Sequence, residues 1–202
     1  MTKSSKPVGT RALKERLKSK KQRTKSSKAW LERQLNDPYV RAAKAQGYRS
    51  RAAYKLKEMD EKFHFLKRGM KVVDLGAAPG GWTQVLVERC GEGNVLGVDL
   101  QPMDPMEGAV LLELNFMDDA APALIREKMS GTVNAVVSDM AAPATGHRET
   151  DHLRIMGLCE AALEFACDVL SPGGIFLCKV LQGGTEKALL ERSRSALAGS
   201  FT

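Results

Sequence analysis

The chain is organised around residues 72–82, Val72-Val73-Asp74-Leu75-Gly76-Ala77-Ala78-Pro79-Gly80-Gly81-Trp82. An apolar run that ends in an acid gives way to a turn of small residues, and the apolar pattern resumes in residues 83–88. This order predicts a strand, a tight loop and a helix. Such a unit is typical of the start of an α/β nucleotide-binding domain.

The glycine spacing of this loop indicates which ligand it suits. The dinucleotide fingerprint has a second glycine two residues after the first, so that the backbone can approach a pyrophosphate. That position is Ala78 here, and the glycines fall instead at Gly76, Gly80 and Gly81, with Pro79 stiffening the turn. A ligand can still approach the backbone closely. A ligand with adenosine and no phosphates therefore fits better than a dinucleotide.

Two further apolar strands also end in an acid, residues 94–100 at Asp99 and residues 133–139 at Asp139. In open α/β sheets, ligands gather outside the carboxyl ends of the strands, so we expect Asp74, Asp99 and Asp139 to converge there. Asp99 follows the first glycine by about 20 residues, the position whose acid accepts hydrogen bonds from ribose hydroxyls. A solvated strand-end carboxylate is the alternative for an isolated Asp. The preceding loop favours the ribose ligand.

A lysine interrupts the last apolar strand, which we expect at residues 175–180 after a Pro172-Gly173-Gly174 turn. Strands of this kind are buried on both faces, where a lysine is seldom found without partners. Lys179 is therefore either held at the rim of the sheet beside Asp139, or is a strand-end lysine whose amine reaches solvent.

The remaining pattern predicts helices on either side of these strands. Ser50 is a candidate N-cap for a helix that runs to Phe63, with an apolar face made by Ala53, Leu56, Met59 and Phe63. A third strand at residues 109–114 is followed by Asn115, and Asp118-Asp119 can cap a helix that ends at Met129. Another helix is expected from about residue 151 to 170. Upstream, weak helical spacing over residues 29–45 is interrupted at Asp37-Pro38, which leaves room for a short helix before Asp37.

Charge is distributed unevenly along the chain. Residues 1–55 hold 17 Lys/Arg against 3 Asp/Glu, whereas residues 56–202 hold 14 against 21. Residues 1–28 are too polar to fold alone, so we expect a disordered basic arm, then a linker over residues 29–47 and a domain over residues 48–202. Basic arms of this kind neutralise RNA phosphates without sequence preference. The alternatives are a solubilising tail and, less in keeping with its lysine-rich composition, a mitochondrial transit peptide.

Composition excludes several classes of protein. No apolar run is long enough to cross a membrane, and the chain does not begin with the apolar segment of a secretory signal. The four cysteines lack C-x-x-C spacing and fall in or beside apolar segments, as buried reduced thiols of a cytosolic protein do. The three histidines form no ligand cluster with them, so no metal site is expected.

Five motifs occur in order along the chain: Arg49-Ser50-Arg51-Ala52-Ala53-Tyr54-Lys55-Leu56, Asp74-Leu75-Gly76-Ala77-Ala78-Pro79-Gly80-Gly81-Trp82, Asp99-Leu100-Gln101-Pro102-Met103-Asp104-Pro105, Ser138-Asp139-Met140-Ala141 and Lys179-Val180-Leu181-Gln182-Gly183. From about Tyr48 onward the sequence therefore resembles the FtsJ/RrmJ family of S-adenosylmethionine-dependent ribosomal RNA 2′-O-methyltransferases. The resemblance implies a Rossmann-like class I S-adenosylmethionine-dependent methyltransferase fold, an α/β architecture with a mostly parallel sheet and helices on both faces.

The resemblance also implies a cofactor, a reaction and a set of site residues. S-adenosyl-L-methionine would be the methyl donor, and a uridine ribose in large-subunit ribosomal RNA the acceptor. The implied cofactor-binding residues are Gly80, Trp82, Asp99, Asn115 and Asp139. Lys55, Asp139 and Lys179 would form the catalytic group, with Lys179 as general base. A lysine can serve as a base only when burial and a neighbouring cation lower its pKa, so we expect Lys179 to be buried and Lys55 to supply the cation.

The sequence departs from the family pattern in two places. Asn115 stands where the family usually has Asp, although its carbonyl can still accept a hydrogen bond from the adenine amino group. The family's catalytic group has a fourth member, a Glu on a late strand, and neither Glu186 nor Glu191 matches its motif. Only five strands are predicted, so we expect a domain that lacks the closing C-terminal hairpin of this fold.

Two other classes of function share some of these features. An NAD-dependent oxidoreductase would have the same strand, turn and helix and an acid at Asp99, but would need the second glycine of the fingerprint. A non-catalytic RNA-binding module would use the basic arm and keep a degenerate site. Within the family, transfer RNA is an alternative acceptor. The favoured interpretation is a monomeric cytoplasmic enzyme whose partner is ribosomal RNA in the large ribosomal subunit, with no membrane association.

Overall fold

The computed structural model describes residue 32 and residues 36–180, 189–191 and 193–194. Its elements are, in chain order, α2 (Pro38–Ala45), α3 (Ala52–Phe63), β1 (Val72–Leu75), α4 (Gly81–Cys90), β2 (Val95–Asp99), β3 (Ala109–Glu113), α5 (Ala121–Met129), β4 (Val133–Ser138), α6 (Arg148–Val169) and β5 (Leu170–Cys178). The basic arm and most of the segment before Asp37 lie outside the described residues. None of the helices that the structure describes is long and apolar enough to cross a bilayer.

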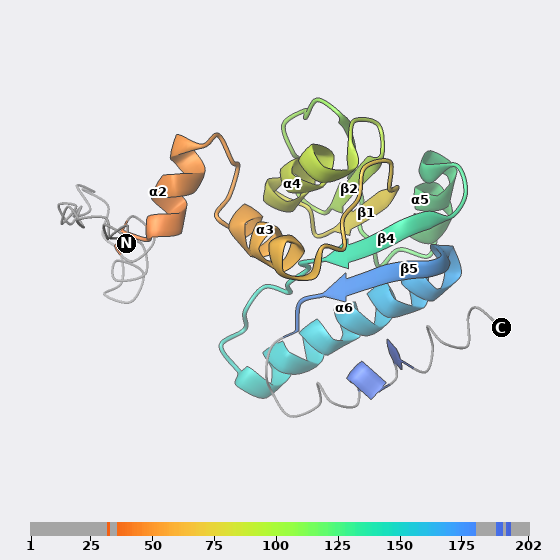
Figure 1. The fold of residues 1–202 in the computed structure, drawn as a ribbon. Helices are drawn as coiled ribbons and strands as arrows, with labels where there is room; N and C mark the ends of the chain where they lie inside the picture. The colour runs from red at the N-terminus through yellow and green to blue at the C-terminus, as the bar shows by residue number, and fades with distance from the viewer. Residues whose placement is uncertain (1–31, 33–35, 181–188, 192, 195–202) are drawn as a thin grey trace, which may run out of the picture.

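The strands form one sheet in the order β3-β2-β1-β4-β5, and every neighbouring pair is parallel (Figure 1). From β1 the chain moves outward through β2 to β3, and then crosses back to β4 on the other side of β1. The loops after β1 and β4 therefore leave the sheet in opposite directions. Ligands of open α/β sheets bind in the crevice at such a reversal, beside the carboxyl ends of the strands.

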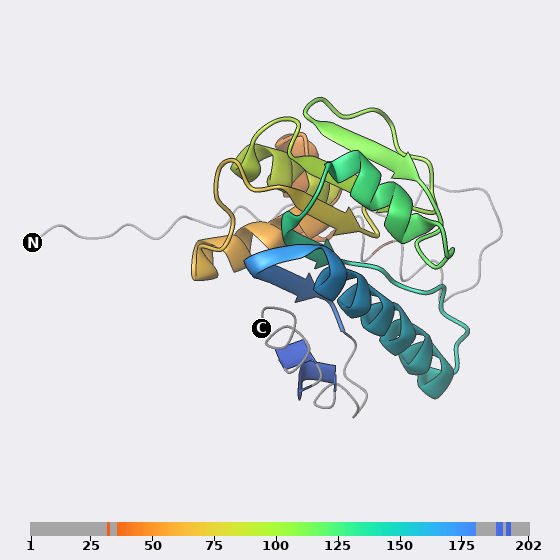
Figure 2. The same cartoon turned by 90° about the vertical axis from the view of Figure 1, so that its right-hand side faces the viewer.

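Helices cover both faces of the sheet (Figure 1 and Figure 2). Successive side chains of a strand point to opposite faces. Val72 accordingly packs with side chains of α3 and α4, such as Leu56 and Leu86, while Val73 packs with side chains of α5 and α6, such as Ile125. All four residues of β1 are buried, including Asp74, which explains why the other three are apolar on both faces of the sheet rather than alternating with polar residues.

Two predicted helix caps are wrong. Arg51, in a helical conformation, precedes α3, and no side chain caps this end of the helix. The Ser50 hydroxyl is buried instead against Gly81, where a Cβ would lie 2.1 Å from its oxygen. Helix α5 likewise begins after Ala120 without a side-chain cap, because the Asp118 carboxylate accepts a hydrogen bond from the Asn115 amide at 2.7 Å.

Asp37-Pro38, where the helical spacing was expected to be interrupted, is the start of α2. Asp37 is the N-cap of α2 and its Oδ1 accepts a hydrogen bond from the Tyr39 N–H at 2.8 Å. Pro38 occupies the first turn, where a missing N–H leaves no helical hydrogen bond unmade. The dipeptide therefore begins a helix.

The apolar face predicted for α3 is buried at its beginning and exposed at its end. Ala53 and Leu56 are fully buried and Met59 is partly buried. Phe63, the last residue of the helix, is 65% exposed, so the predicted apolar face is not buried at its end. His64 follows in the left-handed conformation and turns the chain away.

Strand β5 begins five residues earlier than expected. Val133 of β4 pairs with Leu170 and Ala135 pairs with Ile175, so residues 171–174 bulge out of the ladder. The predicted Pro172-Gly173-Gly174 turn thus lies inside β5. Proline and glycine are tolerated here because β5 is an edge of the sheet that the structure describes.

The four cysteines are free thiols. Cys90 and Cys159 are buried, as expected, whereas Cys167 and Cys178 are only partly buried. Burial raises the pKa of the Cys90 thiol to about 11, so it is unreactive at neutral pH.

Candidate active site

The loop after β1 packs tightly against its neighbours at two glycines. Gly76 has a φ of +77°, and a Cβ there would lie 2.7 Å from the Met140 backbone after β4. Gly80 has a φ of +107°, and a Cβ there would lie 2.7 Å from Cε of Met106. Only glycine suits both the conformation and the contact. The loops after β1, β2 and β4 can therefore meet at the carboxyl end of the sheet.

Asp99 lies at this meeting point, at the end of β2. Its Oδ2 accepts a hydrogen bond from the Ala78 N–H at 2.9 Å, and its Oδ1 accepts one from the Gln101 N–H at 2.8 Å. Each carboxylate oxygen can accept a second hydrogen bond. Asp99 lines a cavity of about 110 Å³ formed by Gly76, Val98, Asp99, Leu100, Leu114, Asn115, Phe116, Met117, Met140, Ala141 and Leu158. We call it the β2–β3 cavity.

The lining of the β2–β3 cavity suits an adenosine group. Its walls are mostly apolar, as a purine ring requires, and Asp99 offers acceptors at one side. Asn115 borders the same cavity, with its side-chain oxygen accepting from the Met117 N–H at 3.1 Å and its amide donating to Asp118. One lone pair of that oxygen remains for an amino group.

Asp74 lies below this site rather than at its surface. The carboxyl is fully buried, and one oxygen is 2.7 Å from the Thr83 hydroxyl, which donates to it. Among the described residues, the other oxygen has no hydrogen-bond partner. Burial raises the pKa of Asp74 to about 7, with further contributions from the negative charges of Asp139 and Asp99. The three strand-end acids thus lie close enough to interact, as the sequence predicted.

The raised pKa of Asp74 predicts a pH-dependent stability. Between pH 5 and pH 7 the unfolded chain has lost this proton while the folded chain keeps it, so the free energy of unfolding falls by about 2 kcal/mol. Asp74→Asn should remove this contribution, so the free energy of unfolding of the variant should rise relative to that of wild type as the pH increases. Urea unfolding at pH 5, 6 and 7 measures it. The exposed Asp119→Asn should follow wild type, and parallel curves for Asp74→Asn would show that Asp74 ionises normally.

Asp139 and Lys179 form an ion pair between the carboxyl ends of β4 and β5. The Lys179 Nζ contacts the Asp139 Oδ1 and also donates to the Asp139 main-chain oxygen at 3.2 Å. The backbone fixes both residues, because the Asp139 N–H donates to Leu75 at 3.0 Å and the Lys179 N–H donates to Ser138 at 2.9 Å. Two of the three donor positions of the amine are therefore directed at Asp139.

The expected burial of Lys179 is wrong. Its side chain is 31% exposed, since β5 is the edge of the described sheet and Lys179 follows its last residue. The alternative of a strand-end lysine whose amine reaches solvent is nevertheless not observed, because the Lys179 amine is paired with Asp139 at the rim of the sheet.

Lys55 and Lys179 border a second and larger cavity, of about 420 Å³. It is lined by Lys55, Glu58, Met59, Lys62, Phe63, Trp82, Leu177, Cys178 and Lys179, and we call it the α3–β5 cavity. The indole of Trp82 is buried and its Nε1 donates to the Ala52 oxygen at 2.9 Å. Trp82 and Gly80 do not line the β2–β3 cavity, where Asp99 and Asn115 lie. In the described part of the chain, no three His, Cys, Asp or Glu side chains are placed to hold a metal ion.

The structure adds Arg49, to which the sequence assigned no role. Its guanidinium donates to the main-chain oxygens of Asp104 and Pro105, both at 2.7 Å, and to that of Pro79 at 3.5 Å. Arg49 thereby joins the loop after β2 to the loop after β1. An arginine three residues before α3 gives no sequence signal for this role, because its acceptors are main-chain oxygens about 30 and 55 residues away.

Comparison with known proteins agrees with this geometry. The sequence model of a family described as FtsJ-like methyltransferase matches residues 48–200. A protein named ribosomal RNA large subunit methyltransferase E from Rhodospirillum rubrum is 58% identical over 195 residues, which cover 94% of this chain and 74% of that protein. The protein of the same name from Granulibacter bethesdensis is 54% identical over 196 residues, covering 97% and 85%.

A solved structure shares the fold. The crystal structure of a ribosomal RNA methyltransferase from Plasmodium falciparum superposes with a TM-score of 0.68 at 28% sequence identity, over 73% of this chain and 86% of that one.

Proposed function

The chain belongs to the FtsJ-like methyltransferase family and is an S-adenosylmethionine-dependent RNA methyltransferase; we propose that it methylates the 2′-hydroxyl of a uridine in large-subunit ribosomal RNA. Relatives that align with more than nine-tenths of this chain carry a name that states large-subunit ribosomal RNA as their substrate. We prefer methyl transfer to the hydride transfer of an NAD-dependent oxidoreductase, because the methyltransferase family model matches residues 48–200.

The observation that carries the proposal is the Asp139–Lys179 pair, which lies where the two cavities approach each other. Met140 and Ala141, which follow Asp139, line the β2–β3 cavity, whereas Lys179 lines the α3–β5 cavity. Adenosine in the first cavity and the acceptor ribose in the second would meet at this pair. The family resemblance implies Gly80, Trp82, Asp99, Asn115 and Asp139 as cofactor-binding residues. Of these, Asp99 and Asn115 line the β2–β3 cavity, and we assign the adenosine to them.

The proposed reaction requires the chain to remove one proton. When bound, S-adenosylmethionine supplies an electrophilic methyl group on a positively charged sulfur. A ribose hydroxyl attacks well only as its proton leaves, so a general base is needed. Neutral Lys179 has two N–H groups and one lone pair. With both N–H groups donated to Asp139, the lone pair remains to accept the proton of the 2′-hydroxyl.

Lys55 and Asp139 complete the proposed catalytic group. Asp139 orients the amine through its carboxylate and its main-chain oxygen. Lys55 adds a second positive charge at the α3–β5 cavity.

Ligand binding distinguishes this proposal from its rivals. S-adenosylhomocysteine should raise the melting temperature of the protein, because a ligand that binds only the folded state stabilises it. NAD should leave the melting temperature unchanged. A shift with NAD alone would instead support an oxidoreductase, and salt-sensitive RNA binding without any response to S-adenosylhomocysteine would support a non-catalytic RNA-binding module.

Methylation of defined RNAs tests the substrate. Large ribosomal subunits, free large-subunit ribosomal RNA and transfer RNA are incubated with methyl-labelled S-adenosylmethionine, and the labelled nucleotide is mapped. We expect one 2′-O-methyluridine in the ribosomal RNA and no label in transfer RNA. Label only in transfer RNA, or on a base, would contradict the proposal.

We further propose that the protein acts as a cytoplasmic monomer.

RNA binding measured at several salt concentrations tests the role of the basic arm. Residues 1–28 carry 11 Lys/Arg and one Glu, so their removal should weaken RNA binding about tenfold at moderate salt and flatten its salt dependence. Affinity for S-adenosylhomocysteine should not change, because the proposed cofactor residues all lie beyond residue 79. A truncated protein with unchanged RNA affinity would identify the arm as a solubilising tail.

A further inference from the structure

An exposed aromatic ring borders the cavity that contains Lys179. Phe63 ends α3 with 65% of its surface exposed, and it lines the α3–β5 cavity together with Lys62. A single exposed apolar side chain is ordinary on a protein surface. Phe63 differs because its ring lies at the rim of the cavity in which Lys55 and Lys179 are placed.

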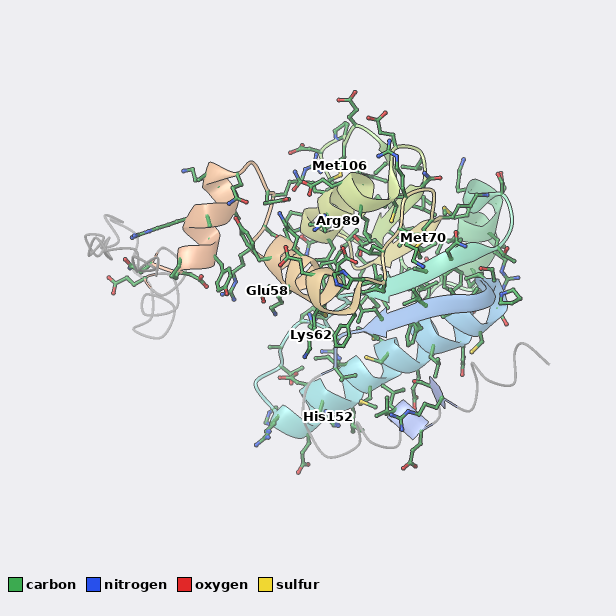
Figure 3. All side chains as sticks on the ribbon, viewed as in Figure 1. Glu58, Lys62, Met70, Arg89, Met106 and His152 are labelled. Atoms are coloured by element: carbon green, nitrogen blue, oxygen red, sulfur yellow. The ribbon has the colours of Figure 1, made fainter. Side chains whose placement is uncertain are left out.

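The position of Phe63 along α3 leaves space for part of an RNA strand. Lys55 and Phe63 are eight residues apart on the same helix, which corresponds to about 12 Å along its axis. On the other side the cavity is closed by Leu177, Cys178 and Lys179 of β5 and the segment after it. Figure 3 shows Lys62 at the end of α3 that lies near the tip of β5. A nucleotide that reaches Lys179 can therefore have its own or a neighbouring base at Phe63.

The charges around Phe63 favour RNA as the occupant. Three lysines, Lys55, Lys62 and Lys179, line the cavity against one acid, Glu58, which accepts a hydrogen bond from the Tyr39 hydroxyl at 3.1 Å. The Lys62 amine lies 5.1 Å from the centroid of the Phe63 ring. The amine therefore lies over one face of an exposed ring and leaves the other face for a base. Proteins bind unpaired nucleotides with this combination, with phosphates near the cation and bases on the ring.

We propose that Phe63 stacks on an unpaired base of the substrate RNA directly next to the methylated nucleotide, with Lys62 near the phosphate between the two. Phe63 is a positioning residue, since it fixes the strand so that the 2′-hydroxyl reaches Lys179. The inference rests on the proposed RNA methylation and adds to it the place where the base is held. In this proposal the ring at the end of α3 is exposed in the free protein because an RNA base covers it in the complex.

Steady-state kinetics of four variants test this role on the ribosomal RNA fragment that contains the methylated nucleotide. Phe63→Ala and Phe63→Leu should each raise the KM for RNA about tenfold, with kcat within twofold of wild type, because stacking on the ring is lost in both. Phe63→Trp should keep the wild-type KM. Val110→Ala is the matched control, an exposed apolar residue on β3, the opposite edge of the sheet. It should leave both constants unchanged.

A spectroscopic measurement separates stacking from a structural effect. 2-Aminopurine, whose fluorescence is quenched when it stacks, replaces the base on either side of the methylated nucleotide in turn. One of the two probes should be quenched by wild type and Phe63→Trp, but not by Phe63→Leu. A Phe63→Leu protein with the wild-type KM, or equal quenching by all variants, would overturn the inference. Failure of the proposed function would look different, since unaltered protein would then methylate no RNA.

Discussion

Lys179→Ala should lower kcat for RNA methylation about 10³-fold, while the Kd for S-adenosylhomocysteine stays within a few-fold of wild type. A positioned general base contributes about 10²- to 10⁴-fold to a rate, and no other amine contacts Asp139 in the described part of the chain. Cofactor affinity should persist because Lys179 lines the α3–β5 cavity and not the β2–β3 cavity. Single-turnover methylation and calorimetric titration measure the two quantities.

Lys179→Arg distinguishes a base from a charge. Arginine can keep the ion pair with Asp139, but a guanidinium does not lose its proton at any working pH. We therefore expect the same loss of rate as in Lys179→Ala. Lys128→Ala, an exposed lysine of α5, is the control and should have wild-type turnover. Near-normal turnover of Lys179→Arg would show that the positive charge, and not proton removal, is what the reaction needs.

Asp99→Ala should raise the Kd for S-adenosylhomocysteine about 100-fold. The carboxylate of Asp99 already holds the Ala78 and Gln101 N–H groups, and it has one acceptor position left on each oxygen for the two ribose hydroxyls. Hydrogen bonds to a charged group contribute about 1.5–3 kcal/mol, and a loss of about 2.7 kcal/mol corresponds to a hundredfold change.

The neighbouring strand supplies a control for Asp99. Glu113 of β3 is paired in register with Asp99 but is exposed and does not line the β2–β3 cavity. Glu113→Ala should therefore change the Kd by less than twofold. Asp99→Asn, which keeps one carbonyl acceptor, should fall between wild type and Asp99→Ala. An unchanged Kd for Asp99→Ala would show that the ribose binds elsewhere.

The sequence alone was sufficient to predict a parallel sheet and the end of it at which the candidate site lies. Apolar runs that end in Asp74, Asp99 and Asp139 specify parallel strands whose carboxyl ends meet, because a buried strand needs apolar side chains on both faces and an acid near the end of such a run marks where the strand ends. The glycine spacing around Ala78 likewise predicted a tight loop that suits an adenosine ligand better than a dinucleotide. Local patterns such as these report on the backbone conformation and its immediate burial, so they can be recognised without knowing the neighbours.

Three features depended on contacts between distant parts of the chain. Ser50 has the residue type of a helix cap, but its hydroxyl packs against Gly81 instead. Phe63 has the spacing of a core residue, yet nothing in the described structure covers it, because β5 ends at the cavity that it borders. Asp74 resembles Asp99 in sequence, and only the packing of α4 shows that it is buried with Thr83.

Lys179 illustrates the division between sequence and tertiary structure. Its place after an apolar strand marked it as unusual, and the family resemblance gave it a role. Its exposure was not predictable, since the same apolar run is buried in the middle of a sheet and partly open at an edge. The order of the strands places β5 at that edge and Asp139 beside it. The sequence thus determined which residues end the strands, and the tertiary structure decided which of them face a cavity, because burial is a property of spatial neighbours.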